Sequence, residues 1–99
     1  MIHDLILLPE ACQDILDAAT WYEGQSDGLG TEFFRCIDAC VNLIRRQPLI
    51  YGILHRNFRR ALVRRFPYAV FFEVDRNAVV IYSVFHCARN PSAWRNRIQ

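Results

Sequence analysis

The sequence predicts an α+β fold in which two amphipathic helices precede most of a β-sheet. Apolar residues recur at helical spacing between Pro9 and Pro48, whereas after Tyr51 they occur in short runs rich in β-branched and aromatic residues. The chain has 99 residues, 53% of them hydrophobic, which is enough for one hydrophobic core and too little for two. We therefore expect a single domain over residues 1–99, with a helix hairpin packed on one face of a small, mostly antiparallel sheet.

The first half of the chain is predicted to form one strand and two helices. Residues 2–8 are an apolar run typical of a strand, and Pro9 ends it and opens a first helix that runs to Glu23. The apolar face of this helix consists of Cys12, Ile15, Leu16, Ala19 and Tyr22. A loop over residues 26–30 predicts an antiparallel hairpin with a second helix. That second helix ends before Pro48, and its apolar stripe consists of Phe33, Ile37, Cys40, Val41 and Ile44.

The second half is predicted to form three strands and a short terminal helix. The strands are expected over residues 58–66, 68–74 and 78–86, with a turn over residues 75–77. Arginines fall on both faces of the first of these strands, so alternation does not set its register. Pro91 is positioned to open a last helical turn. The predicted element order is therefore β-α-α-β-β-β with a short C-terminal helix.

Charge is divided unequally along the chain. Residues 1–44 hold one arginine and eight acidic residues, a net charge of −7, whereas residues 45–99 hold eleven arginines and two acidic residues, a net charge of +9. No lysine is present. Because a guanidinium binds phosphates and carboxylates through a planar fork and stacks on aromatic rings, the second half predicts a surface that binds an anionic partner. The alternative is a solvated basic face that only keeps the protein soluble.

The cysteines and the apolar runs bear on cofactors and location. Cys36 and Cys40 stand one helical turn apart, but no second pair of ligands is spaced for zinc, so we expect no metal and no other cofactor. Buried, reduced thiols are expected instead at Cys12, Cys36, Cys40 and Cys87. No apolar run approaches the roughly 20 residues that cross a bilayer, and no basic region opens the chain, which favours a cytoplasmic protein without a membrane partner.

Several short motifs occur in a specific order along the chain. They are Trp21-Tyr22-Glu23, Gly28-Leu29-Gly30 with Phe33, Phe66-Pro67-Tyr68, and His86-x-x-Arg89-x-Pro91-x-x-Trp94. In this order and spacing they resemble the RelE/ParE superfamily of toxins from bacterial type II toxin–antitoxin systems, over nearly the whole chain from about Cys12 to Arg97. The resemblance implies a compact toxin that a cognate antitoxin wraps and neutralises, with acidic residues facing the arginines. Growth arrest and plasmid stabilization are the roles implied for such a module.

The superfamily contains two kinds of activity. RelE-like members cut mRNA in the ribosomal decoding site, and ParE-like members poison DNA gyrase. Cleavage of RNA through its 2′-hydroxyl needs a general base, cations that stabilise the phosphorane and a general acid. RelE-like ribonucleases use a cluster of lysines and arginines with a tyrosine near the C-terminus, whereas this chain has no lysine and no tyrosine after Tyr82.

A ribonuclease site in this chain would depend on a histidine. The candidate base is His86, because the unperturbed imidazole pKa of about 6.5 suits that role. The candidate phosphate-binding residues are Arg59, Arg65 and Arg89, and no clear general acid accompanies them. The structural alternative is that His86 ends a strand, hydrogen-bonds to a loop and helps to position Arg89 and Trp94.

The ending His-x-x-Arg-x-Pro-x-x-Trp is closer to the ParE-like members, so we expect a toxin that binds DNA gyrase rather than an enzyme. The alternatives are a ribosome-dependent mRNA endoribonuclease and an inactive member that only binds the antitoxin. We do not expect sequence-specific DNA binding by this chain alone, because no predicted helix carries arginines along one face. The candidate target-binding residues are Arg59, Arg60, Arg64, Arg65, Arg89, Trp94, Arg95 and Arg97.

Each of these residues also has a structural interpretation. One or two of the arginines between residues 59 and 65 are expected to pair with acidic residues of the helix hairpin such as Asp14 or Asp38, at about 0–1 kcal/mol for each surface pair. Trp94 is a candidate to close the edge of the core. Trp21 is expected to pack against the edge of the sheet.

Overall fold

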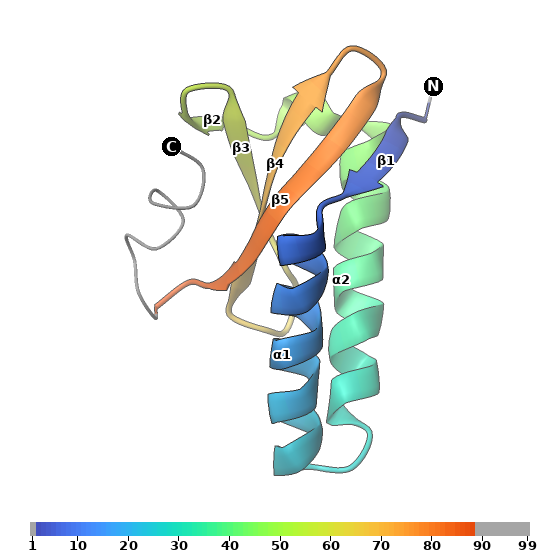
Figure 1. Ribbon diagram of the computed structural model, residues 1–99, viewed down its shortest axis with the longest axis vertical. Helices are drawn as coiled ribbons and strands as arrows, with labels where there is room; N and C mark the ends of the chain where they lie inside the picture. Colours follow the sequence, from blue (N-terminus) through green and yellow to red (C-terminus); the bar gives the residue numbers. More distant parts are fainter. Residues whose placement is uncertain (1, 89–99) are drawn as a thin grey trace.

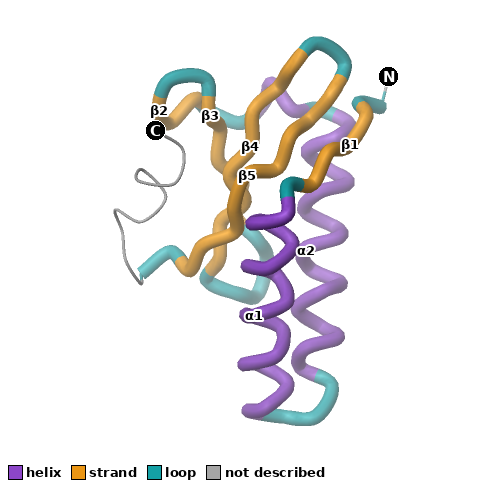
Figure 2. Tube along the Cα trace, viewed as in Figure 1, coloured by secondary structure: helices purple, strands orange, loops and turns teal. Residues whose placement is uncertain are grey.

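The computed structural model describes residues 2–88. Two antiparallel helices lie against one face of a five-stranded sheet, so the fold is α+β as the sequence predicts (Figure 1). Short loops and turns join most of the elements (Figure 2). The elements are β1 Asp4–Leu7, α1 Pro9–Gln25, α2 Leu29–Arg46, the 3₁₀ helix η1 Pro48–Ile50, β2 Ile53–His55, β3 Phe58–Leu62, β4 Tyr68–Asp75 and β5 Ala78–His86. Within this part of the chain, no helix is both long and apolar enough to cross a bilayer.

The sheet is antiparallel except at one edge. Its strand order is β1-β5-β4-β3-β2, and β1 runs parallel to β5 while all other neighbouring pairs are antiparallel. Figure 1 shows this first strand lying beside the last one. A parallel pair cannot be closed by a tight turn. The chain therefore needs a long connection between these two strands, and all the other described elements form it.

Several element boundaries differ from the prediction. β3 ends at Leu62 rather than at residue 66, because Arg65 has a left-handed backbone with φ 70° and Pro67 has no N–H to donate to a ladder. The loop of the helix hairpin is shorter than predicted, since Leu29 and Gly30 already belong to α2. The elements η1 and β2 were not predicted, because an element of three residues is too short to show a periodic pattern. The predicted terminal helix lies outside the described residues.

The turn between α1 and α2 is held by a carboxylate. Gly28 has a left-handed backbone with φ 86°, which suits glycine because it lacks a Cβ. The side chain of Glu23 accepts hydrogen bonds from the backbone N–H groups of Gly28 and Gly30, each with 2.9 Å between heavy atoms. These groups lie at the start of α2, where N–H groups have no partner within the helix. A side chain of α1 therefore caps α2.

We predict that removing this cap lowers the stability of the protein by an amount that depends on pH. The hydrogen bonds from Gly28 and then Gly30 hold the pKa of the Glu23 carboxyl below its usual value, because they favour the charged form. A lowered folded-state pKa contributes stability that is fully present above the unfolded pKa of about 4.3 and is lost as pH falls through the folded value. The melting temperature of Glu23→Gln should therefore lie below that of the wild type at pH 7, and the gap should narrow below about pH 4. A gap that stays constant over thermal melts from pH 7 to pH 3 would show that the charge on Glu23 does not matter.

The hydrophobic core joins the helix layer to the sheet through an aromatic cluster. Phe33 of α2 is fully buried at its centre. The distances between its ring centroid and those of its neighbours are 5.4 Å for Tyr22, 5.1 Å for Phe66 and 5.1 Å for Tyr68. These neighbours come from α1, from the loop after β3 and from β4, so the packing of one ring couples both layers.

The predicted apolar stripe is confirmed for α2 and partly wrong for α1. All five predicted residues of α2 are buried. The prediction for Leu16 of α1 is wrong, since this residue is 51% exposed. Helix α1 packs against both α2 and β5, and small side chains allow this double contact. The buried residues of α1 are accordingly Ala11, Ile15, Ala18 and Ala19.

The prediction of buried thiols holds for only one cysteine. Cys40 is buried, Cys12 and Cys36 are half-buried, and the prediction for Cys87 is wrong because it is exposed. All four are free thiols. Among residues 2–88, no group of three His, Cys, Asp or Glu side chains is arranged to hold a metal ion.

These environments predict a difference in thiol reactivity. Burial raises the pKa of the Cys40 thiol to about 11, so this group stays un-ionised near neutral pH. Because the thiolate is the reactive form, iodoacetamide at pH 8 should label Cys87 in the folded protein and leave Cys40 unlabelled. Peptide mass spectrometry measures the labelling at each site. Labelling of Cys40 as fast as Cys87 without denaturant would contradict the structure.

Candidate target-binding surface

Strand β3 places two candidate arginines on opposite faces of the sheet. Successive residues of a strand alternate between faces, and Ala61, which lies in the core opposite Val70, marks the face toward the helices. Arg59 lies on this same face, is half-buried, and donates a hydrogen bond to the backbone carbonyl of Tyr51. Arg60 lies on the other face and is exposed. Arg59 is thus bound within the fold, whereas Arg60 is accessible to a partner.

An ion pair ties the loop after β3 to α2. Arg65 approaches Glu32 with 2.9 Å between Nη1 and Oε1, and Arg35 approaches the other oxygen of this carboxylate at 3.4 Å. The expected pairing of a β3-region arginine with the helix hairpin is confirmed, although the acid is Glu32 rather than Asp14 or Asp38. The side chains of Arg65 and Arg35 are 72% and 75% exposed, so each pair contributes only about 0–1 kcal/mol.

A groove of about 270 Å³ lies beside α2 and the end of β3. Apolar side chains, including Leu43 of α2, form part of its lining, and arginines surround them. Because β2 pairs with β3 only as far as Arg59, the rest of β3 is a free edge of the sheet. We name the exposed residues of this edge and the following loop the arginine surface: Arg60, Leu62, Arg64 and Arg65.

His86 lies in a cleft whose described lining contains no residue of the arginine surface. It ends β5 on the helix-facing side, opposite Tyr68, with 5.2 Å between the ring centroids. Its Nδ1 accepts a hydrogen bond of 3.0 Å from the backbone N–H of Ala88, which is the loop contact that the structural interpretation expects. The cleft has a volume of about 300 Å³, and its α1 wall includes Asp14 and Asp17. Among the described residues that line this cleft, His86 therefore has acidic neighbours and no arginine.

Asp14 also completes the backbone hydrogen bonding of β5. Strand β1 pairs with β5 only as far as Ile81, and beyond it the backbone N–H of Val84 donates to the Asp14 carboxylate at 2.9 Å. Trp21 of α1 is 48% exposed and lines the same cleft with Val84 and Phe85. That Trp21 packs against the edge of the sheet stays a prediction, although the cleft places this residue near β5. The sequence analysis did not predict this role of Asp14, because it depends on where β1 stops pairing with β5.

The structure separates two of the candidate ribonuclease residues, Arg59 and His86. Arg59 pairs across the ladder with Phe72, and His86 pairs with Tyr68. These positions on β4 are about four residues apart, or about 13 Å at about 3.3 Å for each residue. Arg89 lies outside the described residues, as do the target-binding candidates Trp94, Arg95 and Arg97.

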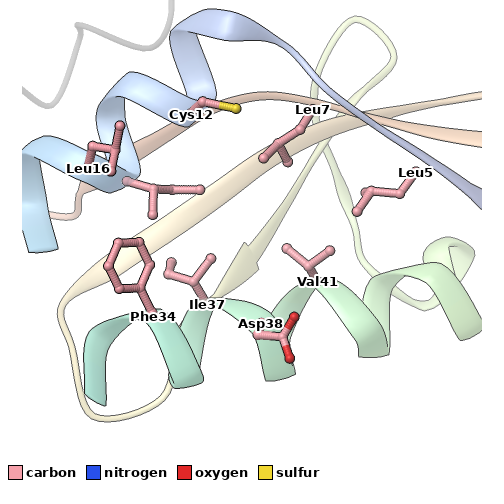
Figure 3. Close-up of a pocket in the computed structure, with 9 residues that line it drawn as sticks. Leu5, Leu7, Cys12, Leu16, Phe34, Ile37, Asp38 and Val41 are labelled. Carbon is pink, nitrogen blue, oxygen red and sulfur yellow. The ribbon is translucent and has the colours of Figure 1, made fainter. Parts of the chain in front are cut away.

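Sequence analysis also missed an apolar groove on the helix hairpin. The groove has a volume of about 420 Å³ and lies between β1, α1 and α2 (Figure 3). Leu16 and Phe34 flank it and are 51% and 43% exposed. Each of these two residues directly follows a buried residue of its helix, which makes the apolar arc of the helix wider than the buried face alone. That wider arc is the feature of the sequence from which the groove could have been predicted. We name it the hairpin groove; its lining is Leu5, Leu7, Cys12, Ile15, Leu16, Phe34, Ile37, Asp38 and Val41.

Two solved structures share this fold. The chromosomal ParDE TA system from P. aeruginosa matches with a TM-score of 0.74 and 14% sequence identity, over 86% of this chain and 96% of that chain. The toxin–antitoxin complex RelBE2 from Mycobacterium tuberculosis matches with a TM-score of 0.59 and 18% identity, over 87% of this chain and 99% of that chain. No curated protein sequence matches.

A family model identifies the chain more directly. The model described as "ParE toxin of type II toxin-antitoxin system, parDE" matches residues 5–91, which is most of the sequence. The match includes both helices, the sheet except for the first residue of β1, and the arginine surface. The chain therefore belongs to the ParE toxin family of type II toxin–antitoxin systems.

Proposed function

We propose that this toxin arrests growth by binding and poisoning DNA gyrase, and that a cognate antitoxin neutralises it. The observation that carries the proposal is the arginine surface, where three exposed arginines lie within three residues of Leu62, which is itself 65% exposed. A guanidinium, with a pKa above about 12, binds anions but does not exchange its proton at neutral pH. Such a surface suits a toxin that acts by binding, because binding requires no general base or acid.

A ribosome-dependent ribonuclease has weaker support. Its candidate base, His86, lies beside the carboxylates of Asp14 and Asp17, which oppose the approach of an RNA phosphate. The candidate phosphate-binding residue Arg59 lies about 13 Å away along the sheet and already donates to a backbone carbonyl. Arg59 and His86, which would have to act together, are thus engaged at separate positions of the sheet.

An antitoxin partner is supported by the descriptions of the two similar structures as a TA system and a toxin–antitoxin complex. The hairpin groove supplies an apolar site for it. Leu16 and Phe34 are exposed there, and covering them would remove apolar surface from water. We infer that apolar side chains of the antitoxin fill this groove.

A gyrase assay with matched arginine variants tests the proposal. Purified toxin without antitoxin should inhibit supercoiling, or cause cleaved DNA complexes to accumulate, at about stoichiometric concentration. Arg60→Gln/Arg64→Gln should raise the concentration for half-maximal inhibition about tenfold or more, because arginines are frequent hot spots of protein interfaces. Arg76→Gln, in the turn before β5, removes a positive charge elsewhere and should leave inhibition unchanged. His86→Gln should also retain inhibition.

Two results would contradict the proposal. If the wild type leaves gyrase unaffected but cuts mRNA on translating ribosomes, and His86→Gln abolishes this cleavage, the toxin is a ribonuclease. If Arg76→Gln weakens gyrase inhibition as much as the double variant, net charge rather than the arginine surface is responsible.

A further inference from the structure

A charged side chain lies in the otherwise apolar lining of the hairpin groove. Among the described residues that line the groove, Asp38 of α2 is the exception, and the others are all hydrophobic. Asp38 is exposed, and its carboxylate accepts a long hydrogen bond, of 3.4 Å, from the side-chain amide of Asn42. The ion pairs found within residues 2–88 do not involve it. The carboxylate can therefore receive a cation from a partner that covers the groove.

The groove follows α2 for about two helical turns. Figure 3 shows Phe34, Asp38 and Val41 in this order along the helix. Each step is about one turn, and the whole distance is about 10 Å at about 1.5 Å per residue. An amphipathic helix that binds in a groove presents its anchors at the same spacing, i, i+3 or i+4, and i+7. A partner helix laid along α2 therefore places apolar side chains against Phe34 and Val41 and a third side chain against Asp38.

The cost of covering Asp38 determines the charge of this third side chain. An apolar side chain there would remove the carboxylate from water without giving it a partner, which costs free energy. A lysine or arginine would pair with the carboxylate instead. All the lining residues of the groove lie within residues 1–44, which have a net charge of −7, so the surrounding charge also favours a cation.

We propose that Asp38 selects the cognate antitoxin by pairing with a lysine or arginine on an amphipathic helix that fills the hairpin groove. The inference rests on the proposed binding of the antitoxin in this groove. No residue of the groove belongs to the arginine surface. The arginine surface fits acidic groups and the groove fits a basic one, so the two surfaces suit different binding segments. An antitoxin with an acidic or apolar residue at this position is rejected, because it leaves the Asp38 carboxylate covered and unpaired.

The test measures by titration calorimetry how tightly the cognate antitoxin binds charge variants of the toxin. Asp38→Lys should weaken binding about tenfold or more, because it places like charges together. Asp27→Lys, in the exposed turn between α1 and α2, changes the net charge equally and should leave the affinity unchanged. Circular dichroism melts show whether each variant folds. Should Asp38→Lys not fold, Asp38→Asn is used instead and should weaken binding about threefold or more.

A compensating substitution in the antitoxin identifies the cation. Each lysine and arginine of the antitoxin is replaced in turn by glutamate. One of these replacements should weaken binding to the wild-type toxin and restore binding to Asp38→Lys to within about threefold of the original affinity, because the pair is then reversed rather than broken. If no replacement restores binding, the pairing of Asp38 with an antitoxin cation is wrong.

Failure of this inference differs from failure of the proposed function. Phe34→Ala shortens an apolar side chain of the same groove. If it weakens antitoxin binding while Asp38→Lys does not, the pairing alone is overturned. If neither variant weakens binding, the antitoxin does not occupy the groove. Weaker gyrase inhibition by Asp38→Lys, with unchanged antitoxin affinity, assigns the groove to the target and overturns the inference. Dissociation of a wild-type oligomer by Phe34→Ala in sedimentation, with unchanged antitoxin affinity, assigns the groove to a second copy of this chain.

Discussion

Replacement of Phe33 by alanine is expected to lower the free energy of unfolding by about 3–5 kcal/mol. The side chain is fully buried, and its ring contacts those of Tyr22, Phe66 and Tyr68. Alanine would leave a cavity between the helix hairpin and the sheet, where neighbours from three segments would lose contacts. Because domains of this size are stable by only about 5–15 kcal/mol, this loss is a substantial fraction of the total stability.

Urea denaturation followed by circular dichroism measures this loss, and Phe34→Ala is its matched control. Phe34 is the next residue of α2 and is 43% exposed in the hairpin groove, so its truncation should cost less than about 1 kcal/mol. The same phenyl group is removed from the same helix in both variants. Equal losses would contradict the burial of Phe33 at the junction of the two layers.

Replacement of Gly30 by alanine is expected to destabilise the protein by about 1–3 kcal/mol, although alanine is the better helix former. A Cβ on Gly30 would lie 2.7 Å from the carbonyl oxygen of Ala19, which is a backbone atom of the facing helix. It would also lie 3.0 Å from the side chain of Glu23. The helices would have to separate, and the hydrogen bond between the Gly30 N–H and Glu23 would lengthen.

The control for this prediction is Gly24→Ala in the last turn of α1. No atom lies within 4 Å of a Cβ at that position. The backbone there is helical, so alanine should be neutral or should stabilise the protein by up to about 1 kcal/mol. Opposite signs for the two substitutions in urea denaturation would establish that helix contact, not helix propensity, decides the effect at Gly30. A stabilising Gly30→Ala would contradict the close approach of α1 and α2.

The local sequence pattern predicted where the helices occur more accurately than which of their residues are exposed. The stripe of α2 was correct in full, because this helix presents one face to the sheet. On α1 the stripe included Leu16, which borders the hairpin groove instead. Helical periodicity identifies an apolar arc, but which part of a wide arc is buried depends on where the neighbouring elements lie.

The sequence predicted which types of residue form the candidate site, but not how those residues are arranged in space. The arginine-rich half is read from the sequence, whereas the exposure of Arg60, Arg64 and Arg65 follows from the structure, in which β3 ends at Leu62. The internal engagement of Arg59 does not follow, because its partner belongs to the segment after η1. The acidic surroundings of His86 likewise come from α1, which is distant in the sequence. The elements η1 and β2 have no periodic signal, since each contains only three residues.

The sequence by itself determined the order and kind of the main elements, the division of charge and the family resemblance. These properties are local, because hydrophobic period, turn residues and motif spacing act between residues close in the chain. Only the tertiary structure decided that β1 joins β5 in parallel, that Glu32 binds Arg65 and that an apolar groove lies between β1, α1 and α2. These features depend on contacts between residues far apart in sequence, whose geometry is set when the hairpin and the sheet bury their shared core.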